Sequence, residues 1–218
     1  MIAFKFIIIA VISYLLGSLN FGVILSRGMK NEDVRDSGSG NAGTTNMMRT
    51  YGKTLGLLTI AGDILKVIFA IWLAFRIVSV EELKMTLDSA SDYPQVVLKS
   101  FAGLFAVLGH IFPCYFKFKG GKGVATSGGM VIAIDWRIAL ILLVIFALTI
   151  LITKYVSLGS ILMAIFYPVF IGIFYKDIIL VFIALVFTVI VIVAHRENVK
   201  RLINHTENKI GSKKKKKE

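Results

Sequence analysis

Charged residues are scarce in this chain. Asp, Glu, Lys and Arg make up 17% of the 218 residues, against 56% for the hydrophobic types, and the mean hydropathy is +0.80. Soluble domains carry about 25% charged residues, so this composition excludes an ordinary soluble fold and indicates a membrane protein. A spanning helix uses about 20 residues, which leaves room for about six or seven spans and none for a separate soluble catalytic domain.

Cysteine and proline are also rare. Cys114 is the single cysteine, which excludes an internal disulfide, and three prolines in the whole chain are typical of helices rather than loops. The alternating segments of an outer-membrane barrel are missing as well. No group of His, Cys and acidic residues has metal-ligand spacing, so the sequence predicts no bound metal. We likewise expect no cofactor and no nucleic-acid partner.

What the chain does contain is a series of seven apolar stretches, at 6–25, 54–75, 96–116, 124–134, 138–152, 158–175 and 178–194. The fourth stretch is short, because eleven residues of helix rise only about 16 Å, against roughly 30 Å of hydrocarbon. Merging it with the fifth would leave six crossings instead of seven.

The distribution of charge favours seven crossings. With an external N-terminus, segments 27–53, 117–122, 153–157 and 195–218 face one side and carry 18 of the 25 Lys and Arg residues. Six Lys and Arg lie on the other side, while acidic residues are equal on both. The positive-inside rule then makes the C-terminus cytoplasmic. We therefore predict an all-α integral membrane protein in which seven transmembrane helices form a single domain at 1–212, before a Lys-rich tail at 213–218.

Every polar, glycine-rich segment then lies on the cytoplasmic face, where loops and helix ends can build one site. The first segment covers 36–49. Gly38, Gly40 and Gly43 match the spacing of a dinucleotide fingerprint, but no strand precedes them and a βαβ unit has no room. A glycine-rich turn before a helix can still present backbone N–H groups to an anion, with Arg49 adding charge. The alternative is a flexible polar loop.

The second segment, 118–126, places three glycines around Lys122 directly before a predicted helix. It lacks the spacing and the Ser or Thr of a Walker A loop, so nucleotide hydrolysis gains no support. Glycine permits close backbone approach, a helix N-terminus is partly positive, and Lys122 adds a full charge, which together are typical of a phosphate site. Alternatively, Lys117, Lys119 and Lys122 are interfacial anchors.

The third segment, 195–209, follows the last span and keeps helical character. On a continuing helix His195, Asn198 and Leu202 share one stripe, where the first two can orient a substrate or move a proton. An amphipathic helix binding anionic lipid is the alternative. Within a span, Asp63 and Lys66 lie about one turn apart, so we expect them to form an ion pair or to approach the polar site.

Together these segments resemble the bacterial acyl-phosphate-dependent glycerol-3-phosphate acyltransferases, the PlsY family. The resemblance rests on residues 38–46 with Arg49, on residues 109–126, and on residues 195–198 with 206–209. Residues 62–66 also fit, although family members often have glycine where this chain has Val67.

The resemblance implies a seven-span enzyme of the bacterial inner membrane. It would transfer the acyl group of acyl phosphate, not of acyl-CoA or acyl carrier protein, to the 1-hydroxyl of sn-glycerol 3-phosphate. The products would be 1-acyl-glycerol 3-phosphate (lysophosphatidic acid) and phosphate, the first acylation in phospholipid synthesis. The implied partners are the two substrates, membrane lipid, and a functional link to the enzyme that makes acyl phosphate.

The resemblance also implies residue roles. Four residues would be catalytic, namely Ser39, Arg49, His195 and Asn198. Substrate or phosphate would be bound by Asn41, Thr44, Thr45, Asn46, Lys66, Lys119, Gly120, Gly121, Lys122, Gly123 and Thr126. Structural roles would fall to Asp63, Glu197 and Glu207. The base that removes the hydroxyl proton is either His195 or a phosphate oxygen of a bound substrate.

Two other classes of protein are alternatives to an enzyme. A small transporter for a phosphorylated metabolite would need charges that reach through the membrane, whereas here the polar segments share one side. A non-catalytic lipid-binding scaffold accounts for the basic tail but not for the Gly, Ser, Asn and Thr residues of segment 36–49.

Overall fold

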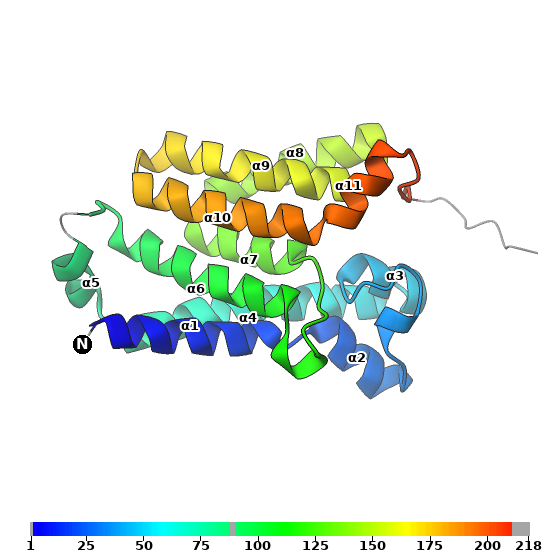
Figure 1. Cartoon of the computed structure of the whole chain (residues 1–218), viewed down its shortest axis with the longest axis horizontal. Coiled ribbons are helices and arrows are strands. Elements are labelled where there is room, and N and C mark those ends of the chain that lie inside the picture. Colours follow the sequence, from blue (N-terminus) through cyan, green and yellow to red (C-terminus); the bar gives the residue numbers. More distant parts are fainter. Residues whose placement is uncertain (1, 88–89, 211–218) are drawn as a thin grey trace, which may run out of the picture.

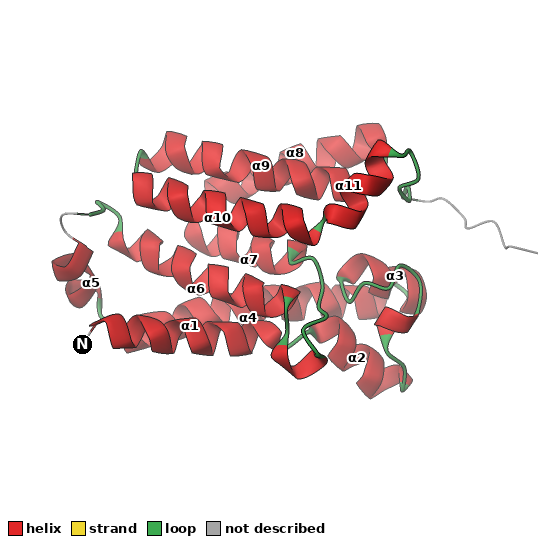
Figure 2. Ribbon diagram, viewed as in Figure 1, coloured by secondary structure: helices red, strands yellow, loops and turns green. Residues whose placement is uncertain are grey.

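The computed structural model describes residues 2–87 and 90–210, and every regular element in these ranges is helical (Figures 1 and 2). The predicted Lys-rich tail at 213–218 lies outside the described residues. Six long helices form the body of the bundle: α1 (Ile2–Ser18), α4 (Lys53–Ile77), α6 (Pro94–Ile111), α8 (Trp136–Thr153), α9 (Val156–Tyr175) and α10 (Ile178–Ala194). The all-α membrane fold is thus confirmed.

Within the described ranges, five helical segments are long and apolar enough to cross a bilayer, or six if the bent pair α10 and α11 (Arg196–Ile203) is one span. A further apolar helix, α7 (Val124–Ile134), has eleven residues and is too short to pass the same test. The short helix predicted at 124–134 is therefore confirmed as a helix, whereas the count of seven crossings stays a prediction.

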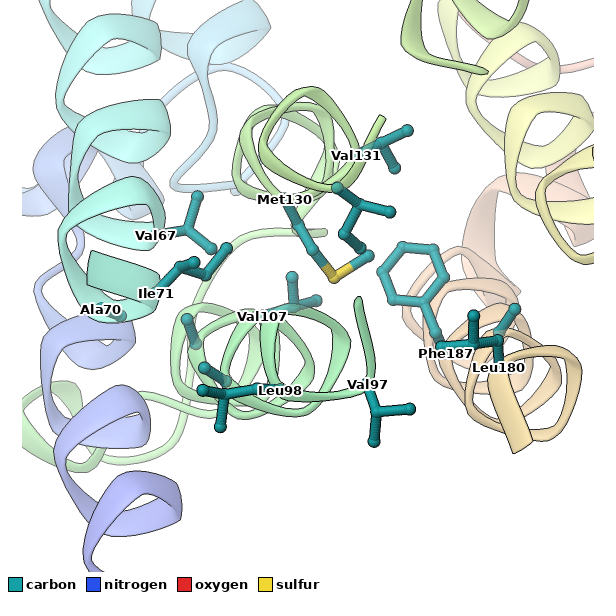
Figure 3. Packing of buried hydrophobic residues seen from close by; sticks show 14 of the residues in the cluster. Val67, Ala70, Ile71, Val97, Leu98, Val107, Met130, Val131, Leu180 and Phe187 are labelled. Atoms are coloured by element: carbon teal, nitrogen blue, oxygen red, sulfur yellow. The ribbon is translucent and has the colours of Figure 1, made fainter. Parts of the chain in front are cut away.

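The hydrophobic core brings together side chains of α4, α6, α7 and α10 (Figure 3). Met130 of α7 is buried against Gly103 of α6, and Val67 of α4 packs against Gly129 at the next position of α7. Phe187 of α10 points into the same cluster. Because α7 touches α4, α6 and α8, this short helix ties the amino-terminal helices to the carboxy-terminal hairpins.

Helices α1 and α6 approach closely, through small residues on both. A Cβ added to Gly17 would lie 2.0 Å from the carbonyl oxygen of Ala106, and one added to Gly109 would lie 2.1 Å from that of Tyr14. Such contacts are typical of membrane helices that pack through small residues, where van der Waals contact replaces the hydrophobic effect. This packing fixes the end of α6 beside the end of α1.

The first predicted span is not one continuous helix. α1 ends at Ser18, and α2 (Phe21–Lys30) begins after Asn20, whose side chain accepts a hydrogen bond from the Val23 N–H. The break frees the carbonyl of Leu19, which accepts from Nζ of Lys66 at 2.9 Å. The buried lysine thus provides a donor for a carbonyl that no longer bonds within a helix.

The three polar segments gather at one end of the bundle (Figure 1). Between α2 and α4 lie the 3-10 turn η1 (Val34–Asp36) and α3 (Thr44–Tyr51), and between α6 and α7 lies η2 (Cys114–Phe116) with the glycine loop. Helix α11 confirms the helical character expected after His195, but it is bent from α10 by 63° and does not continue the last span in a straight line. Helix α5 (Val80–Leu87), which was not predicted, lies at the opposite end.

Candidate active site

Lys122 stands at the centre of the polar end. Its ammonium group is half-buried, and it has no acidic hydrogen-bond or ion-pair partner in the described part of the chain. Burial, together with the nearby charges of Arg201 and Arg49, lowers the pKa of Lys122 to about 8, against the opposing effect of Glu207. Three cations from three separate polar segments therefore share one region, which is the environment that a bound anion stabilises.

The start of α7 adds hydrogen-bond donors beside Lys122. Gly123 is the N-cap residue with φ of +78°, and no side chain caps the helix. The first N–H groups of an α-helix have no partner within it, and they lie at the positive end of the helix dipole. The hydroxyls of Thr126 and Ser127 are buried there without a hydrogen-bond partner in the described residues. This helix start is equipped to hold an oxyanion.

Gly120 and Gly121 do not contribute in the way a phosphate loop suggests. Their N–H groups donate to the carbonyls of Ile111 and His110 at the end of α6, at 3.1 and 3.2 Å. A Cβ on Gly121 would lie 2.3 Å from Nε2 of His110. The two glycines therefore allow the loop to pack closely against α6. The N–H groups available to an anion are those that follow, at the start of α7.

The first polar segment supplies a second uncapped helix start. α3 begins at Thr44 after Gly43, which makes no side-chain cap, and the Thr44 hydroxyl is buried without a partner among the residues described. Thr45 and Ser39 are exposed, as is Arg49 at the end of the same helix. The glycine-rich turn into a helix is thus as predicted, and its Ser39 and Arg49 side chains are accessible from solvent.

Two asparagines of this segment act on the loop itself. Asn46 is buried, and its side-chain amide donates to the carbonyls of Val34 and Ser37, both at 3.0 Å. Its Oδ1 accepts from the N–H of Ser39 at 2.8 Å. Asn41 closes a local turn by accepting from the Gly43 N–H at 2.9 Å. Both were expected to bind substrate, yet their hydrogen bonds shape the turn that carries Ser39.

His195 lies at the bend between α10 and α11 and is buried. Nδ1 is 2.8 Å from the carbonyl oxygen of Val191. A carbonyl only accepts, so Nδ1 carries the hydrogen and Nε2 of the neutral ring is an acceptor. Burial lowers the pKa of His195 to about 4; the Val191 hydrogen bond opposes the shift and the charge of Lys122 adds to it. The ring is neutral at pH 7.

Asn198 is held by a carboxylate network that the sequence motifs only partly indicated. Its Nδ2 donates to Oε1 of Glu207 at 2.9 Å, leaving Oδ1 buried without a partner in the described chain. Glu207 also accepts from Ser157 at 3.0 Å and from Nε of Arg201 at 2.8 Å. Although burial opposes the change, these hydrogen bonds lower the pKa of Glu207. These bonds are compatible with the structural role expected of Glu207, which stays a prediction.

Sequence reasoning missed Arg201 and Ser127. Arg201 was not among the expected site residues, yet it lies on α11 after the 63° bend and its charge acts on Lys122. Ser127 directly follows a predicted site residue, Thr126. Its position in the first turn of a helix was the available signal.

Four predicted residues lie away from the cation cluster or are fully engaged elsewhere. Lys66 is buried, donates to Oδ1 of Asp63 at 2.7 Å and to the Leu19 carbonyl, and lies 2.8 Å from Nδ1 of His110. The expected ion pair of Lys66 with Asp63 is confirmed, whereas the expected role of Lys66 in substrate binding stays a prediction. Lys119 is exposed, and Glu197 makes only surface ion pairs with Arg196 and Lys200.

Comparison with known proteins identifies relatives along almost the whole chain. The family model described as glycerol-3-phosphate acyltransferase matches residues 7–205. A glycerol-3-phosphate acyltransferase of Clostridioides difficile is 42% identical over 214 residues, covering 97% of this chain and 98% of the relative. One from Bacillus subtilis is 40% identical, covering 93% and 96%.

Solved structures agree with the sequence relatives. A crystal structure of PlsY, an integral membrane glycerol 3-phosphate acyltransferase, in its glycerol 3-phosphate form is 34% identical, with a TM-score of 0.81 over 94% of this chain and 96% of that one. Its lysophosphatidic acid form is 33% identical, with a TM-score of 0.78 over 94% and 95%. This chain therefore belongs to the glycerol-3-phosphate acyltransferase family and is an integral membrane acyltransferase.

Proposed function

We propose that this protein transfers the acyl group of acyl phosphate to the 1-hydroxyl of sn-glycerol 3-phosphate. The observation that carries this proposal is Lys122 at the start of α7. It is half-buried, forms no ion pair with an acidic side chain among the described residues, and lies near the charges of Arg49 and Arg201. Both substrates carry a phosphate group, and a cluster of cations with open N–H groups is suited to two such anions. The acyl chain of the donor can lie among the apolar helices.

The two uncapped helix starts suggest how the anions divide. The start of α7 offers Lys122 with the Thr126 and Ser127 hydroxyls, and the start of α3 offers the Thr44 hydroxyl on the helix that carries Arg49. A phosphate at each would place the acceptor hydroxyl and the donor carbonyl between them. Holding the two reactants in this way removes much of the entropic barrier of a bimolecular step.

The reaction needs no covalent acyl-enzyme. The acceptor oxygen forms a bond to the acyl carbon, the carbonyl oxygen becomes negative, and the carbon–oxygen bond to phosphate then breaks with its electron pair leaving on phosphate. The cationic cluster and the helix-start donors stabilise the charge that develops on these oxygens. Products are 1-acyl-glycerol 3-phosphate and phosphate, as in the first acylation of phospholipid synthesis.

We assign the proton of the attacking hydroxyl to a phosphate oxygen of a bound substrate. His195 was the other candidate, but burial lowers its pKa to about 4, whereas a phosphate monoester has a second pKa of about 6 and is the stronger base. His195 then serves through its neutral Nε2, which accepts a hydrogen bond and orients the acceptor. Asn198 acts beside it through its free Oδ1.

The site would lie at the cytoplasmic face of the bacterial inner membrane, with the N-terminus outside. Water-soluble glycerol 3-phosphate then reaches the cations from the cytosol, while the lipid-like donor arrives from the bilayer or from the enzyme that makes it. The excess of Lys and Arg in the segments at this end supports this orientation.

The donor assignment is tested with protein purified in detergent. Glycerol 3-phosphate is supplied with palmitoyl phosphate or with palmitoyl-CoA, and lysophosphatidic acid is measured by mass spectrometry. We expect product only from palmitoyl phosphate. Lys122→Ala should reduce kcat/KM with that donor by about 10² to 10³-fold, because it removes an anion ligand of the developing charge.

Product from the thioester and none from the mixed anhydride would reject the proposed donor while leaving the acyltransferase activity in place. Full activity of Lys122→Ala would reject the location of the site.

A further inference from the structure

Arg35 connects two polar segments that lie more than 80 residues apart in sequence. Its Nη1 donates to the carbonyl oxygens of Phe116 and Lys119, at 3.1 and 2.7 Å. Its Nε and Nη2 donate to the two oxygens of Asp33 at 2.9 and 2.7 Å. The guanidinium group is planar and rigid, so this set of bonds defines one orientation between the η1 turn and the loop after η2.

The loop is shaped to receive this side chain. Lys117 and Phe118, between the two accepting carbonyls, both have a left-handed backbone, with φ of 57° and 56°. Two consecutive non-glycine residues in this region are strained and require support from the surroundings. The guanidinium provides it, because it accommodates both carbonyls on one nitrogen.

Arg35 joins the η1 turn to the loop after η2, and each of these two segments is connected to a cation of the proposed site. On one side, Lys119 is followed three residues later by Lys122, with Gly120 and Gly121 pinned to α6 between them. On the other side, Asn46 ties the carbonyls of Val34 and Ser37, which flank Arg35, to α3.

Arg49 lies on that same helix, one turn after Asn46. No other described side chain forms a hydrogen bond between η1 and the loop after η2.

We propose that Arg35 is a positioning residue that sets the separation between the Arg49 guanidinium and the Lys122 ammonium, and hence the alignment of the two bound phosphates. Arg35 itself contacts backbone and Asp33, not substrate. This inference rests on the proposed pair of anion sites, and it adds the residue that holds the two sites at a fixed separation.

The chain offers a matched control in Arg27. Arg27 also donates to Asp33, at 2.8 and 3.1 Å, and also lies over the Phe116 ring, at 5.7 Å against 5.9 Å for Arg35. It makes no hydrogen bond to the carbonyls of Phe116 or Lys119 among the contacts of the described residues. In either single variant Asp33 keeps one arginine, so neither leaves that carboxylate without a cation.

The experiment compares Arg35→Met, Arg35→Lys and Arg27→Met in the full-length protein. We expect Arg35→Met to lower kcat/KM for glycerol 3-phosphate by about 10²-fold, with both a higher KM and a lower kcat, since misplacement by about 1 Å has effects of this size. Arg35→Lys should fail to restore activity, because an ammonium cannot span Asp33 and both carbonyls. Arg27→Met should stay close to wild type, as exposed ion pairs contribute little.

Calorimetric titration of glycerol 3-phosphate without any acyl donor gives a second readout. Weaker binding in Arg35→Met, at an unfolding temperature equal to that of Arg27→Met, supports a positioning role. Because this titration needs no donor, it separates the inference from the identity of the acyl phosphate substrate.

Equal affinity and equal kcat/KM in the Arg35 and Arg27 variants would overturn the proposal. So would unfolding of both Arg35 variants, since Arg35 would then belong to the stability of the fold alone.

Discussion

At the scale of single residues, the proposed site contains a lysine, Lys122, whose pKa is lowered. Burial and the charges of Arg201 and Arg49 bring the pKa of Lys122 to about 8, well below that of an exposed lysine. The cation is present below this pH and is lost as the pH rises through it. Anion binding to the free enzyme should follow the same course, while a bound phosphate should favour the protonated form and hold the charge to higher pH.

We therefore predict that kcat/KM for glycerol 3-phosphate decreases above about pH 8, whereas kcat declines only at higher pH. Steady-state kinetics between pH 6 and 10 measure this, because kcat/KM reports the groups of the free enzyme. In Lys122→Arg the guanidinium stays charged, so the alkaline decrease near pH 8 should disappear even if the activity at neutral pH is lower.

Lys117→Arg is the control for this series. Lys117 is exposed in the preceding loop and contacts none of the site groups described above, so its pH profile should match the wild type. If kcat/KM of Lys122→Arg still decreased above about pH 8, the decrease would belong to the titration of another group.

At the scale of elements, the glycine-containing loop at 117–123 connects η2 to α7 and packs against the end of α6. The N–H groups of Gly120 and Gly121 bond to the end of α6, and the start of α7 that follows has no side-chain cap. His110 lies under Gly121 and is itself held by Lys66, so the loop rests on a surface that cannot move aside easily.

Gly121→Ala should consequently displace the loop. The added Cβ would come within 2.3 Å of Nε2 of His110, so we expect a destabilisation of roughly 1–3 kcal/mol and about a tenfold weaker affinity for glycerol 3-phosphate. Thermal unfolding and calorimetric titration measure the two effects.

Gly128→Ala provides the matched substitution within α7. A Cβ there would meet nothing within 4 Å, and alanine favours a helix interior over glycine by about 0.5–1 kcal/mol, so stability should rise slightly with unchanged activity. If Gly121→Ala bound glycerol 3-phosphate as tightly as Gly128→Ala, the loop would not depend on its contact with His110.

At the scale of the whole molecule, the polar segments occupy one end of the bundle and α5 the other (Figure 1). The excess of Lys and Arg at the polar end predicts that this end is cytoplasmic. With this orientation, we expect glycerol 3-phosphate to enter from the cytosol.

Cysteine labelling tests this orientation in a Cys114→Ser background. Met85 at the α5 end and Arg196 on α11 are 78% and, at the side chain, 67% exposed. We expect a membrane-impermeant maleimide to label Met85→Cys in intact cells, and Arg196→Cys only after permeabilisation. The reverse pattern would place the site on the outer face and contradict the proposed route of the acceptor.

Much of this protein follows from the sequence alone. Hydropathy and charge are sums over local segments, so they indicated a helical membrane protein, the short helix at 124–134 and the gathering of three polar segments at one end. The ion pair of Asp63 with Lys66 was also predictable, because a charge in an apolar span needs a partner within reach along the helix.

The tertiary structure decided which polar groups remain open for substrate. Gly120, Gly121, Asn46 and Lys66 look like binding groups in sequence, yet their hydrogen bonds are taken up by α6, by η1 and by the break after α1. Arg201 follows the bend at His195, and its charge lowers the pKa of Lys122. Whether a donor is free depends on acceptors that other segments bring to it, and this is a property of contacts between distant residues rather than of local composition.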